Sequence, residues 1–401
     1  MNQFIALTEK YSPNNYSPLD IVLTEGKGAH VKDSDGNTYI DCVSGFSVLN
    51  QGHGHPKIIQ AFLDQSQKIT MTSRALYSDN LGTWEEKICK LANKNKVLPM
   101  NTGTEAVETA IKVATKWGQD IKGINALDAE IIAMEGNFHG RTIGSLSLSS
   151  NDSYKEGFGV LAGNIKYSEF GNAEEIASLI TPNTTAIILE PIQGEGGVHI
   201  PPKNFIKEVK ALCEQHQILL IADEIQVGLG RTGKMFAMEW EGVEPDIYLL
   251  GKALGGGLYP ISAVVANDDV MQVLTPGTHG STFGGNPLAC AVSIAALDVL
   301  IDESLPERSQ QLGEKLLNGL KKIDSPIIKE VRGRGLFIGI ELNEQAQSIV
   351  SSINEQGVLC KETQGNIIRL APPLVIEEQD IDTIVNVITQ TIEEKSKQYQ
   401  S

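Results

Sequence analysis

Two apolar segments of the sequence each end at a residue that could do chemistry, an aspartate in one case and a lysine in the other. Residues 218–222 meet their first charge at Asp223, and residues 247–250 are followed by a glycine and then Lys252. Such runs are typical of parallel strands buried on both faces, whose carboxyl ends meet at the sheet edge where ligands bind. A lysine and a carboxylate there suit pyridoxal phosphate (PLP): the amine forms a Schiff base, and the carboxylate keeps the pyridine nitrogen protonated. Singly, each residue fits better as a capping aspartate or a surface lysine, but together they favour the cofactor.

A predicted helix start further upstream offers a seat for a phosphate group. Thr102 and Glu105 have the spacing of a capping box, and Gly103 and Thr104 lie between them. Free backbone amides and the positive end of the helix dipole would attract a phosphate there. Most capping boxes serve only their own helix, so this interpretation depends on the cofactor already being indicated.

Two loops carry further candidates for a ligand site. In the glycine-bounded loop 136–142, Phe138 could lie against a flat cofactor ring and Arg141 could bind a carboxylate with two hydrogen bonds. A plain loop with a solvated arginine fits this stretch equally well. Tyr16, in the proline- and asparagine-rich segment 11–20, could reach a site, although the local sequence favours a packed loop tyrosine.

Two carboxylates near the same sheet edge suggest an acid-base or arginine-pairing role. Glu190 ends another apolar run, and Glu195 follows it within a glycine-rich loop. Arg369 lies in an apolar segment and therefore needs a partner, for which Glu195 is a candidate.

The elements that must position these residues predict an α/β chain of two domains. A large domain with a mostly parallel central sheet flanked by helices should hold the strand-end residues. The composition shifts after residue 287, and a helix near residues 289–301 should lead into a smaller α+β domain with strands at 336–342, 358–363 and 367–370. We expect residues 1–45 to form an N-terminal segment that packs with the small domain and the active site, residues 46–288 the large domain, and residues 289–401 the small domain.

Composition limits the possible functions. A chain of 401 residues with 41% hydrophobic residues can bury a large core, and its net charge of -17 disfavours nucleic acid and anionic membranes, which would repel it. The N-terminus lacks a basic region followed by an apolar run, and no apolar stretch is long enough to cross a bilayer, so we expect the cytoplasm. The five scattered cysteines predict neither a disulfide framework nor a zinc site, and His53 and His55 have no third ligand at metal-site spacing. We therefore predict no metal.

Several motifs together resemble a known family. The chain is similar, over nearly its whole length, to the class III aminotransferases of PLP fold type I, and most closely to their ornithine members. The motifs of the class in general are Asp-Glu-Ile-Gln at 223–226, Gly-Lys-Ala-Leu at 251–254 and Gly-Ser-Thr-Phe-Gly-Gly-Asn-Pro at 280–287. Those more specific to ornithine members lie at 50–58, 72–77 and 98–106.

The resemblance implies a role for each residue around the cofactor. Lys252 would be the Schiff-base lysine and the proton shuttle, and Asp223 would pair with the pyridine nitrogen. Gln226 would lie near the ring hydroxyl. The remaining implied contacts are the ring sandwich of Phe138 and Ile225, the phosphate seat of Gly103 and Thr104, and Ser281 and Thr282 from a neighbouring subunit. Because Ser281 and Thr282 would come from another subunit, the resemblance implies at least a homodimer.

The resemblance also implies how one site takes two unlike substrates, L-ornithine and 2-oxoglutarate. Glu195 would pair with Arg369 while ornithine is bound, and swing aside so that Arg369 can hold 2-oxoglutarate. Arg141 and Tyr16 would hold the distal carboxylate of either substrate. Phe46 stands where ornithine members are expected to carry a substrate-lining tyrosine, and this departure loosens the expected fit to ornithine.

The expected activity is an ornithine δ-aminotransferase that makes glutamate 5-semialdehyde, which cyclises to pyrroline-5-carboxylate, and glutamate. This reaction belongs to arginine breakdown or proline synthesis. The nearest alternative is an aminotransferase for N-acetylornithine or 4-aminobutyrate. A PLP mutase or racemase would need no external oxo acid, and a non-catalytic PLP-binding protein would not react with amines.

Overall fold

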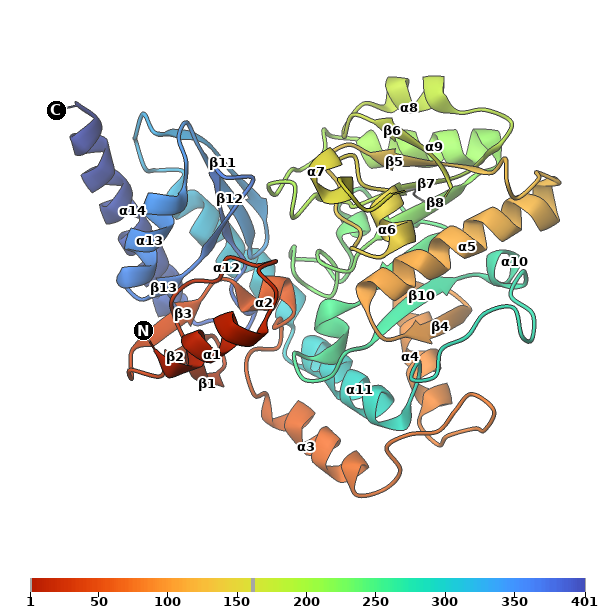
Figure 1. Cartoon of the computed structure of the whole chain (residues 1–401), viewed down its shortest axis with the longest axis horizontal. Coiled ribbons are helices and arrows are strands. Elements are labelled where there is room, and N and C mark those ends of the chain that lie inside the picture. The colour runs from red at the N-terminus through yellow and green to blue at the C-terminus, as the bar shows by residue number, and fades with distance from the viewer. Residues whose placement is uncertain (1, 160–162, 401) are drawn as a thin grey trace.

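The computed structural model describes residues 2–159 and 163–400, and its largest element is a seven-stranded sheet in the order β4-β10-β9-β8-β7-β5-β6 (Figure 1). All neighbouring strands are parallel except β10, which is antiparallel to both β4 and β9. The prediction of a mostly parallel central sheet is therefore confirmed. The strands are β4 (Lys96–Met100), β5 (Glu130–Met134), β6 (Asn164–Ser168), β7 (Thr184–Leu189), β8 (Leu219–Asp223), β9 (Ile247–Leu250) and β10 (Ser262–Ala266).

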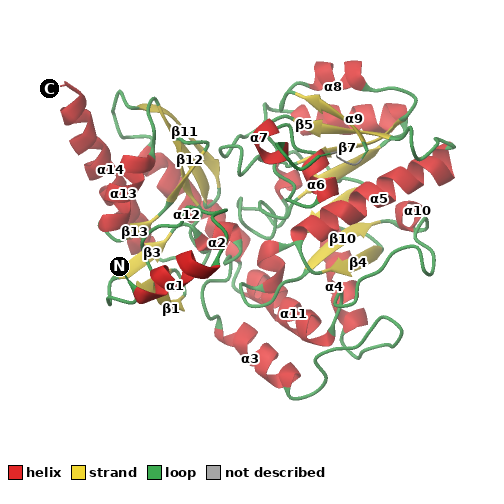
Figure 2. Ribbon diagram, viewed as in Figure 1, coloured by secondary structure: helices red, strands yellow, loops and turns green. Residues whose placement is uncertain are grey.

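Helices cover both faces of this sheet, and its central strands β7, β8, β9 and β10 are therefore buried at every residue (Figure 2). In β8, Leu219 and Ile221 pack into a core with α5, whereas Leu220 and Ala222 join the core that contains α9 and α11. The helices of this part of the chain are α3 (Pro56–Ser66), α4 (Leu81–Ala92), α5 (Gly103–Lys122), α6 (Ile143–Ser147), α7 (Asp152–Lys155), α8 (Ala173–Leu179), α9 (Phe205–His216), α10 (Asp268–Met271) and α11 (Pro287–Asp302).

The parallel strands bring the candidate residues to one edge of the sheet. Asp223 is the last residue of β8 and is in register with Leu249 of β9, so Lys252 follows only a few residues beyond it. The N-terminus of α5 opens at the same edge, because β4 runs parallel to β9 and ends just before the helix. The predicted convergence of these elements is therefore present.

A second, four-stranded sheet belongs to the C-terminal part of the chain (Figure 1). Its order is β11-β12-β15-β14 and its neighbours are all antiparallel. Arg369 lies in β15, opposite Gly339 of β12. The elements are α12 (Leu305–Leu320), β11 (Ile328–Arg334), β12 (Phe337–Leu342), α13 (Gln347–Glu355), β14 (Lys361–Thr363), β15 (Ile367–Leu370) and α14 (Glu378–Gln400).

A third sheet joins the two ends of the chain and corrects one prediction. Its order is β1-β2-β3-β13, with β13 (Val358–Leu359) parallel to β3. The single strand expected over 358–363 is wrong: β13 pairs with the N-terminal sheet, and β14 begins after Cys360 in the other sheet. The remaining N-terminal elements are α1 (Gln3–Tyr11), β1 (Leu23–Lys27), β2 (His30–Asp33), β3 (Thr38–Asp41) and α2 (Ser44–Ser47).

Across the described residues, none of the helices combines the length and the apolar character that a membrane span requires.

Candidate active site

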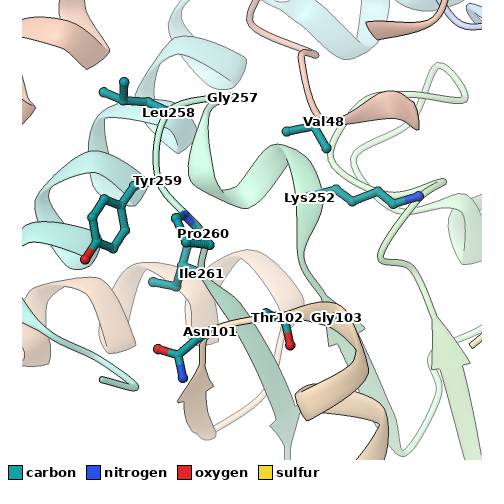
Figure 3. A pocket seen from close by; sticks show the side chains of 10 residues that line it. All are labelled: Val48, Asn101, Thr102, Gly103, Lys252, Gly257, Leu258, Tyr259, Pro260 and Ile261. Carbon is teal, nitrogen blue, oxygen red and sulfur yellow. The ribbon is translucent and has the colours of Figure 1, made fainter. Parts of the chain in front are cut away.

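The side chain of Lys252 reaches across the edge of the central sheet (Figure 3). It extends past Val48 and away from Tyr259, from a backbone with a left-handed φ of 45° at the start of a short 3-10 turn, Lys252–Gly255. Burial lowers the pKa of its amine to about 8, against the opposing charge of Glu195. A lysine with this pKa has a substantial neutral fraction near pH 8, and a neutral amine is nucleophilic and can accept a proton.

Asp223 is held by a buried histidine. Its carboxylate accepts a hydrogen bond from the Ile225 amide at 3.1 Å and lies 2.6 Å from Nδ1 of His139. Burial disfavours the imidazolium form of His139, but the hydrogen bond and the charge of Asp223 outweigh it, so the pKa of His139 is raised. His139 therefore faces Asp223 through Nδ1 and helps to fix the position of its carboxylate.

Glu190 adds a second buried carboxyl group beside this pair. It accepts hydrogen bonds from the backbone amides of Phe138 at 3.1 Å and Gly194 at 3.3 Å. Burial raises the pKa of Glu190 to about 7, although the nearby His139 opposes the shift. Glu190 lines the same cavity as Lys252, so the site holds two groups that titrate near neutral pH.

A cavity of about 210 Å³ separates these groups, and its walls suit a flat ring with a phosphate. Phe138 and Ile225 both line it, and Ile225 is packed against Gly103 so closely that a Cβ at Gly103 would lie 3.1 Å from its Cγ2. An adjoining cavity of about 320 Å³ shares Gly103 and Lys252 and opens towards residues 257–261 (Figure 3).

The N-terminus of α5 faces the cavity in the manner that the sequence predicted. The Thr102 hydroxyl accepts from the Glu105 amide, and the Glu105 carboxylate accepts from the Thr102 amide, so the capping box is confirmed. Gly103 and Thr104 line the cavity, and the Thr104 hydroxyl lies 2.7 Å from that of Ser145. Backbone amides, a hydroxyl group and the helix dipole are therefore available to an anion.

The predicted partner of Arg369 is present. Its guanidinium donates to the Glu195 carboxylate at 2.6 Å, and the Gln226 amide donates to the same oxygen at 3.0 Å. Burial alone would raise the pKa of Glu195, but Arg369 and Lys252 outweigh it and the pKa is lowered. Glu195 is therefore an anion that neutralises Arg369 at the edge of the cavity.

Phe46 lies over this ion pair in an unusual backbone conformation. Its ring centroid is 5.4 Å from the Arg369 guanidinium carbon, and its carbonyl oxygen accepts a hydrogen bond from Gln226 at 3.3 Å. Phe46 has a φ of 61°, and its neighbours Gly45 and Ser47 are also left-handed. The pocket therefore keeps an aromatic ring beside Arg369 but has no hydroxyl group at this position.

Six predicted residues do not line the cavity within this chain: Phe46 and Arg369, described above, and Tyr16, Arg141, Ser281 and Thr282. Tyr16 is 76% exposed, and Arg141 is also exposed. Ser281 accepts hydrogen bonds from the Asn101 side chain at 2.9 Å and the Gly284 amide at 3.0 Å, and Thr282 is exposed. The roles of Tyr16 and Arg141 towards substrate, and of Ser281 and Thr282 in a neighbouring site, stay predictions.

His139 is the main residue that sequence reasoning did not assign. It directly follows Phe138 in a loop already singled out for its aromatic ring, but a single histidine carries no signal for its partner. A buried carboxylate such as Asp223 needs donors, but the same loop also offers Asn137, Arg141 and Thr142, so the sequence does not single out His139.

The residues present fit PLP. Asp223 suits a pyridine nitrogen, Lys252 an aldehyde, the N-terminus of α5 a phosphate, and Phe138 with Ile225 the two ring faces. The unpartnered Nε2 of buried His139 is a further donor or acceptor within the described part of the site. The fold and this arrangement are those of a fold type I aminotransferase.

Comparison with known proteins agrees with this class. Residues 11–392 match the family described as Aminotransferase class-III, and the chain belongs to that family. A protein named ornithine aminotransferase 1 from Staphylococcus saprophyticus is 70% identical over 386 residues, which cover 96% of this chain and 98% of that relative.

Two solved structures are informative. The ornithine aminotransferase from Toxoplasma gondii, described as having partial occupancy of PLP at its active site, is 41% identical with a TM-score of 0.96, covering 98% of this chain and 95% of the other. The acetylornithine aminotransferase from Elizabethkingia anophelis is 45% identical with a TM-score of 0.88, covering 98% of each chain.

Proposed function

We propose that this chain is an ornithine δ-aminotransferase that uses PLP to transfer the terminal amino group of L-ornithine to 2-oxoglutarate. The products are glutamate 5-semialdehyde, which cyclises to pyrroline-5-carboxylate, and glutamate. The observation that carries the proposal is the Glu195–Arg369 ion pair, which lies beside Lys252 at the edge of the cavity. The 70% identity to a Staphylococcus saprophyticus protein of that name supports it.

The chain's own residues divide the work of the reaction. When bound, PLP would supply an electron-accepting ring next to the carbon that carries the substrate nitrogen. Lys252 would bind it covalently through Nζ and, when free, carry a proton at Nζ to and from that carbon. Asp223, oriented by His139, would hold the proton on the ring nitrogen. Gly103 and Thr104 would bind the phosphate.

The ion pair accounts for the use of two unlike substrates. With ornithine bound, Glu195 neutralises Arg369, so the diamine meets no uncompensated positive charge. With 2-oxoglutarate, Glu195 rotates away and Arg369 binds the carboxylate next to the keto group through paired hydrogen bonds. Arg141 and Tyr16 bind the distal carboxylate of either substrate.

An aminotransferase for N-acetylornithine is the second candidate, with 4-aminobutyrate as a further donor. The absence of a hydroxyl group at Phe46 favours it, as does the 45% identity to the Elizabethkingia anophelis enzyme of that name. Dependence on an oxo acid distinguishes all of these from a mutase or a racemase.

The assembly proposed here is a cytoplasmic homodimer or higher homo-oligomer, with Ser281 and Thr282 reaching the neighbouring site. We further propose that residues 46–288 form the large domain and residues 289–401 the small domain. Residues 1–45 would pack with the small domain and the active site. The pairing of β3 with β13 supports this last assignment.

The test is pyrroline-5-carboxylate formation by the purified protein with PLP and 2-oxoglutarate. Ornithine is compared with N-acetylornithine and 4-aminobutyrate at matched concentrations. Strong turnover of ornithine that depends on the oxo acid supports the proposal. Faster consumption of 2-oxoglutarate with either competitor would leave the family intact and refute the proposed substrate.

A further inference from the structure

The guanidinium of Arg141 lies in the corner formed by two aromatic rings. Its carbon lies 3.8 Å from the ring centroid of Tyr154 and 5.4 Å from that of Phe138. The two rings meet edge to face, with centroids 6.3 Å apart and planes at 87°. Phe138 lines the cavity that contains Lys252, and Arg141, which does not line this cavity itself, therefore lies next to a residue of its wall.

Aromatic faces hold a cation without using its hydrogen-bond donors. Within the described part of the chain, no carboxylate forms an ion pair with Arg141, although the side chain has a fixed neighbour in Tyr154. Cation–π contact leaves the fork of N–H groups free, and a carboxylate would bind that fork with two parallel hydrogen bonds. An acidic partner in place of the ring would instead neutralise the charge and occupy the donors.

Tyr154 is itself fixed from the neighbouring elements. It lies in α7, whose start is capped by Asn151, which accepts from the Ser153 amide at 3.0 Å. The next residue, Lys155, places its amine 5.3 Å from the ring centroid of Tyr167 in β6. The hydroxyl of Tyr167 donates to the Ser147 carbonyl at 2.7 Å. Through Lys155 and Tyr167, the short helix that carries Tyr154 is therefore connected to α6.

We propose that Tyr154 is a positioning residue for substrate selection: its ring holds Arg141 ready to bind the distal carboxylate of the substrate. This inference rests on the proposed function, in which Arg141 receives the α-carboxylate of ornithine. The ring and not the hydroxyl carries the role, because the Tyr154 hydroxyl donates no hydrogen bond to any residue that the structure describes.

The experiment compares Tyr154→Leu with Tyr154→Phe in the holoenzyme. Single-turnover spectra give the apparent Kd and the limiting rate for ornithine and for 1,4-diaminobutane, which is ornithine without its carboxylate. Tyr154→Leu should raise the apparent Kd for ornithine by about two- to thirty-fold with little change in limiting rate. The Kd for 1,4-diaminobutane should stay unchanged, and Tyr154→Phe should restore ornithine binding.

Two controls separate positioning from general disturbance of the segment. Phe158→Leu changes an aromatic residue of the same segment that is 67% exposed, and should leave both amines unaffected. In an Arg141→Met background, Tyr154→Leu should add no further loss, because the two side chains act as one unit. Calorimetry should show weaker binding of glutarate, a dicarboxylate that cannot react, to Tyr154→Leu. The Tyr154→Phe and Phe158→Leu variants should bind it as the wild-type protein does.

Equal losses for both amines, or a Tyr154→Phe variant as weak as Tyr154→Leu, would overturn the role assigned to the ring. An unchanged Kd for ornithine in Tyr154→Leu would do the same. Failure of the proposed function is recognised separately, in the wild-type protein. If that protein uses N-acetylornithine, the same comparison is made with N-acetylornithine and N-acetyl-1,4-diaminobutane, which again differ only by the carboxylate.

Discussion

Replacing Glu195 with alanine should weaken the ornithine half-reaction much more than the glutamate half-reaction. Glu195 lies 2.6 Å from Arg369, whose side chain is only 7% exposed, so the change leaves a buried positive charge without its partner. Ornithine brings further positive charge to the same pocket, whereas glutamate brings a carboxylate that can replace Glu195 as the partner of Arg369.

The magnitude follows from the charges and their exposure. Two like charges about 5 Å apart repel each other by about 3 kcal/mol at an effective dielectric constant of 20. The Glu195 side chain is 25% exposed, and solvent reduces this value, so we expect about 2 kcal/mol. That free energy corresponds to a roughly 30-fold loss in kcat/KM for ornithine.

The assay follows each half-reaction separately by single-turnover absorbance of the bound cofactor. Glu377→Ala is a matched control, because Glu377 pairs with Arg308 at 3.2 Å but its side chain is 76% exposed, and both half-reactions should stay unchanged. Equal losses in the two half-reactions of Glu195→Ala would refute the switch.

Three further predictions concern other parts of the site and fold. Phe46→Tyr should raise the ratio of kcat/KM for ornithine to that for N-acetylornithine, and an unchanged ratio would count against a substrate role for this position. Covalent uptake of PLP by the cofactor-free protein should accelerate as the pH rises through about 8, because deprotonation of Lys252 frees its amine, and stopped-flow absorbance should show no uptake in Lys252→Ala. Arg231→Met should reduce the free energy of unfolding by about 3 kcal/mol in denaturant titrations, because buried Arg231 donates to the carbonyls of Leu336 and Pro372, which would lose their donors.

Contacts in the site could be predicted from the sequence where a local pattern marked each residue and a general rule of sheet topology or burial brought the residues together. Asp223 and Lys252 end apolar runs, and parallel strands bring such ends together, so their proximity could be predicted. The Glu195–Arg369 pair joins residues 174 positions apart, yet an arginine in an apolar strand needs partners for its donors, and Glu195 in the glycine-rich loop was a candidate. In both cases the expected burial of a charged side chain limited the positions and partners that it could have.

Contacts without such a requirement could not be predicted. His139 and Asp223 lie 84 positions apart, and a single histidine fits many environments. Residues 358–363 divide between two sheets because the two short strands in this range pair with different neighbours. With only two residues, β13 is too short for its sequence pattern to indicate its partner. The pairing of Arg141 with Tyr154 likewise depends on how α7 is placed, which no local pattern in that segment indicates.

The backbone around Phe46 links the one departure from the expected motif to the ion pair. Ser44, Gly45, Phe46 and Ser47 are all left-handed, a conformation that costs about 1 to 3 kcal/mol for each residue other than glycine. Gln226 supports this turn through the Phe46 carbonyl and, with the same amide nitrogen, donates to the carboxylate of the Glu195–Arg369 pair. A movement of Glu195 away from Arg369 therefore changes the support of the turn that carries Phe46. The residue type at position 46 should for this reason affect both which donor is preferred and how readily the ion pair opens.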